Sequence, residues 1–196
     1  MALLRLTEKE LVQRVCGGDG EAFNRLVSRW EKKLFNYAYR LTGNREEAFD
    51  VCQDSFIRAY EQIRQLKEPA KFSNWLFRIA RNYCISRYRA EQGMPRIEAR
   101  PDEEEGPDLE NLLATAPPVR MDSGQSFETS ELRLMLERAM DYLPFEQRET
   151  IVLKIFEGLK FAEIAEIAEC PVSTVKSRLY LGMIQLKKIL EQKPKD

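Results

Sequence analysis

Histidine is absent from this chain of 196 residues, and its absence excludes several kinds of site. Histidine is the commonest side-chain metal ligand and the commonest general acid or base in proteins. The four cysteines (Cys16, Cys52, Cys84 and Cys170) are widely spaced and include no C-x-x-C pair. The sequence therefore predicts no metal site and no disulfide framework, and it favours reduced thiols in a cytoplasmic protein.

Two further absences argue against membrane insertion and nucleotide chemistry. The sequence has no run of 18 apolar residues, and its first residues meet charge too early for a signal peptide. The GGDG stretch at residues 17–20 lacks the Lys and Ser/Thr of a phosphate-binding loop. With no cofactor loop and no paired carboxylates in an identifiable pocket, we expect a protein that needs no cofactor and is not an enzyme.

Apolar residues recur at helical spacing through most of the chain, and nothing reads as a strand. Thr7 is a plausible first cap, Pro69 interrupts the helical pattern, and Gly158 ends a segment that Pro144 begins. The pattern predicts an all-α protein with helices over residues 6–15, 21–41, 45–63, 72–92, 128–142, 144–156, 161–168 and 173–192.

The middle of the chain differs in composition from both ends. Residues 93–127 carry 3 basic and 8 acidic residues, several prolines and few apolar side chains. Such a segment cannot bury enough surface to offset its ordering entropy, so we expect a flexible acidic linker. It would join two small helical domains, residues 1–92 with 17 basic and 12 acidic residues and residues 128–196 with 11 and 12.

The last two predicted helices have helix-turn-helix spacing. Cys170, Pro171 and Val172 form the expected turn, and Ser173 or Thr174 is the expected cap of the second helix. We expect one face of that helix to pack inward through Val175, Leu179, Gly182 and Leu186. The other face carries Ser173, Lys176, Ser177, Tyr180 and Lys187, which suits the DNA major groove. The alternative is an ordinary helical hairpin with a solvated face.

The segment 72–89, FSNWLFRIARNYCISRYR, contains four arginines and five aromatic residues but no acidic residue. The pattern predicts a core face of Phe72, Trp75, Leu76, Ile79 and Tyr83. The opposite face carries Phe77, Arg81, Cys84 and Tyr88, flanked by Arg78, Asn82 and Arg89. Aromatic rings stack on unpaired bases and arginines hold phosphates, so this face favours single-stranded nucleic acid. The alternative is that these rings pack on a neighbouring helix while the arginines reach past them to solvent.

Three stretches together resemble one family: DVCQDSFIRAYEQI, FSNWLFRIARNYCISRYR and FAEIAEIAECPVSTVKSRL. They are similar to the extracytoplasmic-function subfamily of bacterial sigma factors, over roughly residues 5–92 and 128–190. The resemblance implies a transcription initiation factor that keeps the second and fourth conserved sigma regions, joined by a short linker. The expected partners are core RNA polymerase, through its β′ clamp helices and β flap, promoter DNA as duplex and as non-template single strand, and an anti-sigma factor.

The resemblance also implies which residues bind each partner. The residues expected to bind core polymerase are Asp50, Gln53, Asp54, Phe56, Ile57 and Tyr60, although a plain amphipathic helix with Phe56, Ile57 and Tyr60 partly in the core is the alternative. The residues expected to bind the −10 element, around a pocket for a flipped base formed by residues 64–71 and Asn82, are Lys67, Lys71, Phe77, Arg78, Arg81, Asn82, Tyr88 and Arg89. The residues expected to bind the −35 element are Ser173, Thr174, Lys176, Ser177, Arg178 and Tyr180.

One stretch departs from the family pattern. Leu181 and Met183 stand where members often carry basic residues, and we expect Leu181 near the exposed side and Met183 near the buried edge. This change weakens the expected phosphate clamp. Two other functions remain open at this point: a helix-turn-helix regulator that acts without polymerase, and a thiol redox sensor.

Overall fold

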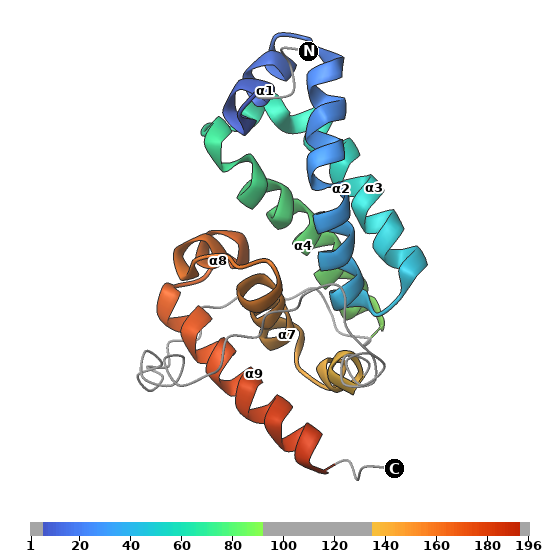
Figure 1. Cartoon of the computed structure of the whole chain (residues 1–196), viewed down its shortest axis with the longest axis vertical. Coiled ribbons are helices and arrows are strands. Elements are labelled where there is room, and N and C mark those ends of the chain that lie inside the picture. Colours follow the sequence, from blue (N-terminus) through green and yellow to red (C-terminus); the bar gives the residue numbers. More distant parts are fainter. Residues whose placement is uncertain (1–5, 92–134, 193–196) are drawn as a thin grey trace. The chain divides into compact units, whose positions relative to one another are not determined.

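The computed structural model describes residues 6–91 and 135–192, which form helices and contain no strand (Figure 1). The predicted all-α class is confirmed. The predicted acidic linker, residues 93–127, lies outside the described residues, as does the first part, residues 128–134, of the helix predicted over residues 128–142. None of the helices in the described part of the chain is long and apolar enough to span a membrane.

The described residues divide into two compact units. The first contains residues 6–91 together with 162–169, and the second contains residues 135–161 and 170–192. Each unit is built around its own buried apolar side chains, as expected for small helical domains.

The first unit begins with three capped helices, α1 (Glu8–Cys16), α2 (Gly20–Thr42) and α3 (Arg45–Gln62). Thr7 and Glu10 form a reciprocal capping box at the start of α1, which confirms the predicted cap. Asp19 caps α2. Each cap satisfies backbone N–H groups that a helix start leaves without an intrahelical partner.

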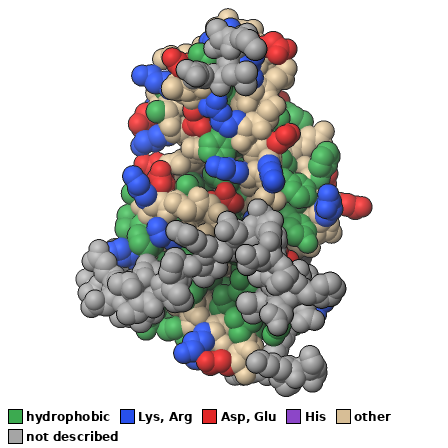
Figure 2. Space-filling view, viewed as in Figure 1, with side chains coloured by type: hydrophobic (Ala, Val, Ile, Leu, Met, Phe, Trp, Pro, Cys, Tyr) green, Lys and Arg blue, Asp and Glu red, His purple; other side chains and the backbone are tan. Residues whose placement is uncertain are grey.

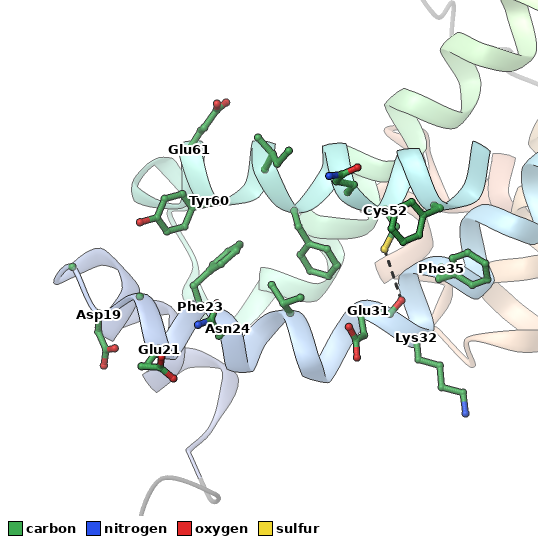
Figure 3. Close-up of a pocket in the computed structure, with 17 residues that line it drawn as sticks. Asp19, Glu21, Phe23, Asn24, Glu31, Lys32, Phe35, Cys52, Tyr60 and Glu61 are labelled. Carbon is green, nitrogen blue, oxygen red and sulfur yellow. Dashed lines mark hydrogen bonds between the residues drawn. The ribbon is translucent and has the colours of Figure 1, made fainter. Parts of the chain in front are cut away.

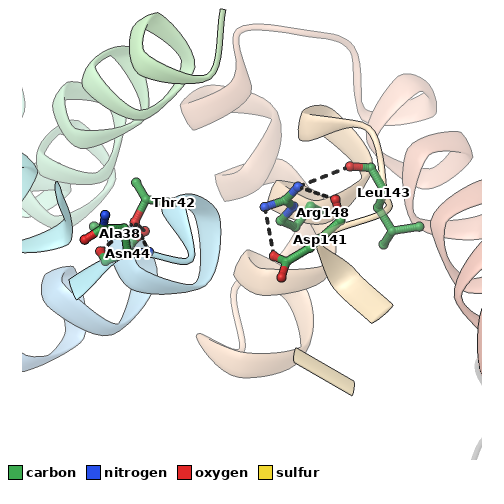
Figure 4. A network of polar contacts seen from close by, with 6 residues as sticks. All are labelled: Ala38, Thr42, Asn44, Asp141, Leu143 and Arg148. Atoms are coloured by element: carbon green, nitrogen blue, oxygen red, sulfur yellow. Dashed lines mark hydrogen bonds and ion pairs between the residues drawn. The ribbon is translucent and has the colours of Figure 1, made fainter. Parts of the chain in front are cut away.

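The turn between α2 and α3 is closed by short-range polar contacts (Figure 4). Gly43 ends α2 with a φ of 69°, a left-handed conformation that glycine adopts at little cost. The Thr42 hydroxyl donates to the carbonyl oxygen of Ala38 at 3.1 Å, and the Asn44 side chain accepts from Glu46 N at 2.9 Å. This turn sends α3 back along α2 (Figure 1).

Two 3-10 turns separate α3 from α4 (Phe72–Glu91): η2 (Ile63–Gln65) and η3 (Pro69–Lys71). Helix α4 packs on both α2 and α3, and α1 packs on η3. The loop that the resemblance assigns to base recognition therefore lies between α1 and the start of α4. Among residues 6–91, the largest fully buried side chains are Leu11, Leu26, Leu34, Tyr37, Phe72, Leu76 and Phe77.

The second unit contains a helical segment at 135–140, α7 (Phe145–Ile151), the π-helical turn η4 (Val152–Phe156) and α9 (Val172–Gln192). The short α8 (Phe161–Ala168) precedes α9 in sequence and has the predicted bounds. Gly158 stops the preceding segment with a φ of 69°, as the sequence predicts.

Arg148 joins α7 to the chain before it (Figure 4). Its guanidinium donates to the carbonyl oxygens of Asp141 at 3.0 Å and Leu143 at 3.4 Å, and it lies 3.4 Å from the Asp141 carboxylate. The side chain is buried, so it supplies donors to carbonyl groups that water cannot reach easily. Arg148 thus ties the turn at 141–144 to the first turn of α7.

Helix α9 packs on α7, and Gly182 lies at their contact. A Cβ added at Gly182 would stand 3.0 Å from Ile151 Cδ1 and 3.2 Å from Gln147 Cβ. The close approach of the two helices therefore depends on a residue without a side chain at this position. Val175, Leu179 and Leu186 are buried on α9 too, which confirms the predicted inward face.

We predict that Gly182→Leu lowers the thermal melting midpoint of the protein, because the new side chain overpacks the contact of α7 and α9 at a cost of about 1–3 kcal/mol. Met183→Leu is the matched control, since Met183 is exposed and the exchange conserves volume. Melting would be followed by circular dichroism. Equal midpoints for the two variants would contradict the packing described for Gly182.

Candidate nucleic-acid and partner interfaces

A groove of about 1480 Å³ runs along α2 and α3 in the first unit (Figure 3). Apolar side chains form much of its lining, and Figure 2 shows apolar side chains reaching the surface on the side where these helices lie. Acidic side chains are also present in the lining, with a single lysine among the described lining residues, Lys32. The lining acids are Asp19, Glu21, Glu31 and Glu61.

Several apolar side chains in the lining of this groove are exposed. Phe23 of α2 meets Tyr60 of α3 edge-on, with ring centroids 4.9 Å apart. Ile57 and Tyr60 keep 52% and 56% of their surface exposed, and Phe49 is exposed as well. Exposed apolar side chains grouped in a groove mark a binding surface, and acids at its edge favour a partner with basic residues. The groove has the chemistry to bind an amphipathic helix.

The structure brings together four of the six residues predicted to bind polymerase. Gln53, Phe56, Ile57 and Tyr60 line the groove. Asp50 and Asp54 do not line it, and the Asp50 carboxylate pairs with Arg87 of α4 at 3.4 Å. Phe56 is buried and forms part of the core, which agrees with the partly structural role left open for it.

Sequence reasoning missed the α2 side of the groove. Phe23, Val27 and Phe35 of α2 are half-buried and line the groove, and none of them was predicted as a binding residue. Periodicity identifies an apolar face but does not separate residues covered by the fold from residues at the edge of that face. The acid-rich start of α2 beside this apolar face was the only available signal.

Cys52 lies in the groove wall with the properties of a structural thiol. Its Sγ lies 3.8 Å from the carbonyl oxygen of Glu31, as Figure 3 shows. Burial, together with the Glu31 carboxylate, raises the pKa of Cys52 to about 11. A thiol reacts as its thiolate, so Cys52 is poorly suited to the redox sensing considered from the sequence.

Helix α4 presents a different face from the one the sequence predicts. Phe77 is 1% exposed and lies edge-on to Trp30 and Tyr37, with centroids 6.0 and 5.1 Å away. Arg81 is also buried. The prediction that Phe77 and Arg81 face outward is wrong, because α2 covers this side of α4. The alternative reading, that aromatic side chains here pack on a neighbouring helix, is correct for Phe77.

Other predicted residues of the −10 set do reach the surface. Lys67, Lys71, Arg78 and Asn82 are exposed, while Tyr88 and Arg89 are half-buried. Trp75 and Tyr83, which the sequence assigns to the core, are half-buried too. The exposed residues of this set therefore carry basic or amide groups, and the aromatic rings near them are half-buried.

The turn before α9 differs from its prediction by one to two residues. Helix α9 begins at Val172, so Ser173 and Thr174 stand inside its first turn, and Val175 N donates to the carbonyl oxygen of Pro171 at 3.1 Å. Glu169 ends the preceding segment with a φ of 53°, in the left-handed region. The turn is thus formed by Glu169, Cys170 and Pro171.

The predicted −35 residues fall into three groups. Ser173 is exposed, and Thr174 and Tyr180 are half-buried. Lys176 stands 5.9 Å from the ring centroid of Phe161, and Arg178 donates to Cys170 Sγ at 3.5 Å. The Ser177 hydroxyl oxygen is buried and has no hydrogen-bond partner among the described residues. Within α9 the face predicted for DNA is therefore partly engaged by the protein itself.

Leu181 and Met183 are both exposed, by 51% and 38%. This confirms the expected position of Leu181 and corrects that of Met183, which was expected near the buried edge. Two apolar side chains consequently occupy the surface of α9 at positions where the family resemblance implies bases. A phosphate clamp from these two positions is absent.

Comparison with known proteins places these surfaces in context. Residues 26–93 match the model of Sigma-70 region 2, and residues 133–186 match that of Sigma-70 region 4. The chain is 35% identical over 182 residues to the ECF RNA polymerase sigma factor SigW of Bacillus subtilis, covering 93% of this chain and 96% of that protein. It is 36% identical over 179 residues to the ECF RNA polymerase sigma-E factor of Haemophilus influenzae, covering 90% and 91%.

Two solved structures share the fold. The structure of CnrH in complex with the cytosolic domain of CnrY matches with a TM-score of 0.68 and 21% identity, covering 95% of this chain and 99% of that chain. The sigma factor RpoE in complex with the anti-sigma factor NepR from Bartonella quintana matches with a TM-score of 0.60 and 21% identity, covering 88% and 98%. At this identity the likeness concerns the fold.

Proposed function

Because the chain belongs to the ECF family of RNA polymerase sigma factors and is an alternative sigma factor, we propose how its parts divide the work of transcription initiation. Residues 1–92 form the domain that binds core polymerase and the −10 element. Residues 128–196 form the domain that binds the −35 element, and residues 93–127 link the two. The two separate family matches, at 26–93 and 133–186, support this division.

The groove of α2 and α3 is the proposed docking site for the clamp helices of the polymerase β′ subunit. The observation that carries this proposal is the exposure of Ile57 and Tyr60 beside acidic lining residues. An amphipathic helix with basic residues would bury these apolar side chains and pair with the acids. Gln53 and Phe56 belong to the same surface, whereas Asp50 and Asp54 lie outside the lining and would act on the partner through long-range charge.

The same groove is the proposed binding site of an anti-sigma factor. The proposed location of the protein is the cytoplasm, where it would meet polymerase. The two structural neighbours were each solved with a bound partner, and the partner of RpoE is an anti-sigma factor. A partner that covers Ile57 and Tyr60 would exclude polymerase directly, because one apolar surface cannot be buried twice. Inhibition would then follow from competition for one groove.

The loop 64–71 and the exposed face of α4 are proposed to hold the non-template strand of the −10 element. Lys67, Lys71 and Arg78 supply positive charge for phosphates, and the Asn82 amide can donate to and accept from one base edge. Tyr88 and Arg89 extend this surface toward the end of α4. Phe77 and Arg81 are left out, since both are buried.

Helix α9 is proposed to read the −35 element with few phosphate contacts. Ser173, Thr174, Lys176 and Tyr180 are accessible to DNA, while Arg178 would have to leave Cys170 to reach it. Leu181 and Met183 add apolar surface in place of charge. These two side chains would contact the polymerase β flap, whereas basic residues at the same positions would bind DNA phosphates.

We predict that Ile57→Asp abolishes co-elution of the full chain with core polymerase, because it places a charge in the centre of an apolar contact that already has acids in its lining. Its thermal midpoint should stay close to the parent value, since Ile57 is exposed. The matched control is Arg58→Asp, a new acid at an exposed neighbour that does not line the groove. Undiminished co-elution of Ile57→Asp would contradict the docking site.

We predict that Asn82→Ala in the holoenzyme reduces discrimination at one base of a single-stranded −10 oligonucleotide by about 1–3 kcal/mol. The expected cause is loss of the paired donor and acceptor of the amide. The measurement is the affinity for oligonucleotides substituted base by base, beside the melting midpoint of each variant. An equal loss at every base, or an early melting transition, would show that Asn82 has a structural role instead.

A further inference from the structure

The Glu8 carboxylate joins three helices of the first unit through its two oxygens. Oε1 accepts a hydrogen bond from the backbone N–H of Ser73, the second residue of α4, at 3.2 Å. Oε2 accepts from the indole Nε1 of Trp30 on α2 at 2.9 Å. A single side chain from α1 is thus bonded both to the backbone of α4 and to the side chain of α2.

Helix α4 gains from Glu8 what its own sequence does not provide. Its first turn contains no acidic residue, although the first N–H groups of a helix lack intrahelical acceptors and attract negative charge. Glu8 supplies an acceptor and a negative charge there from a helix 65 residues earlier in the chain. The position of the first turn of α4 is therefore set by α1, in addition to the packing of its own apolar face.

Burial disfavours the charged form of the Glu8 carboxylate, and hydrogen bonds and nearby cations offset part of this cost. Burial raises the pKa of Glu8, while the bonds from Ser73 and Trp30 and the nearby charges of Arg29 and Lys33 lower it in part. The chain just before α1 is also held, because Arg29 of α2 donates to the carbonyl oxygen of Leu6 at 2.9 Å. Helix α2 thus holds both the chain before α1, through Arg29, and the Glu8 side chain, through Trp30.

We infer that Glu8 is a positioning residue for promoter reading: through Ser73 it fixes the start of α4 and the adjoining η3 turn, which carry the residues proposed to hold the −10 element. Lys71 ends η3 two residues before Ser73, and Asn82 follows Ser73 on the same helix. The packing of α1 on η3 makes this link local. The inference rests on the proposed function of α4, but it assigns a role to a residue that does not itself touch DNA.

The test compares variants of the full chain in the holoenzyme, bound to single-stranded DNA selected from a randomised pool and then substituted base by base. Glu8→Ala is expected to lower the affinity ratio between preferred and substituted strands on the order of tenfold, the effect of one misaligned base contact. Co-elution with core polymerase should be unchanged, because Glu8 does not line the groove of α2 and α3. Glu8→Gln retains one acceptor oxygen and should give an intermediate ratio.

Glu10→Ala is the matched control for mere loss of helix stability. Glu10 lies on the same helix, and its carboxylate closes the capping box with Thr7 at the start of α1 and does not bond to the start of α4 as Glu8 does. If Glu10→Ala lowers the melting midpoint as much as a Glu8 variant does and leaves the base ratio intact, the positioning role is supported. If both change the ratio equally, or if Glu8→Ala leaves it unchanged, the inference is wrong.

A third substitution covers the case in which Glu8→Ala does not fold. Trp30→Phe removes the indole donor but keeps a ring beside Phe77, so Glu8 loses one of its two bonds. It should reduce the base ratio by a smaller factor than Glu8→Gln does, and an unchanged ratio in both of these variants would overturn the inference. If Asn82→Ala loses base discrimination and the Glu8 variants do not change it, only the inference about Glu8 is wrong. If Asn82→Ala does not change base discrimination, the proposed function of α4 is wrong.

Discussion

The Phe77 ring lies between Trp30 and Tyr37, and this aromatic contact decides which face of α4 is left open. Burying a phenylalanine contributes about 1.5–3 kcal/mol, and edge-on ring pairs add about 0.5–1.5 kcal/mol each. The ring therefore fixes the rotation of α4 about its own axis. With Phe77 turned inward, Arg78 and Asn82 are exposed, and the surface that can meet a nucleic acid follows from a core contact.

Trp30 takes part in two constraints at once. Its ring packs against Phe77, while its indole N–H donates to Glu8, whose other oxygen holds the first turn of α4. Trp30 of α2 thus takes part in setting both the rotation of α4 about its axis and the position of α4 along that axis. A helix that reads bases needs both, because a hydrogen bond to a base edge tolerates little displacement.

Much of the fold could be predicted from the sequence, because capping residues and periodicity act locally. Thr7, Gly158 and the limits of α8 follow from such signals. The orientation of α4 could not be predicted, because a helix with rings on two sides has two possible core faces, and only the position of α2 chooses between them. The bond between Glu8 and Ser73 could not be predicted for the same reason, since it joins residues 65 positions apart in the sequence. Polymerase-binding residues were predicted on α3 alone, because helical spacing on α2 does not tell the half-buried residues of the groove wall from the core residues beside them.

In the proposed function, the exposed apolar surface of α2 and α3 contacts polymerase, and the exposed face of α4 binds the opened strand. The most direct measurement is transcription by purified core polymerase from a randomised promoter library, with and without the full chain, followed by mapping of the transcript starts. We expect transcript starts that depend on the chain and lie at a fixed distance from two shared sequence blocks. Binding to duplex DNA without any transcript above that of core polymerase alone would contradict it.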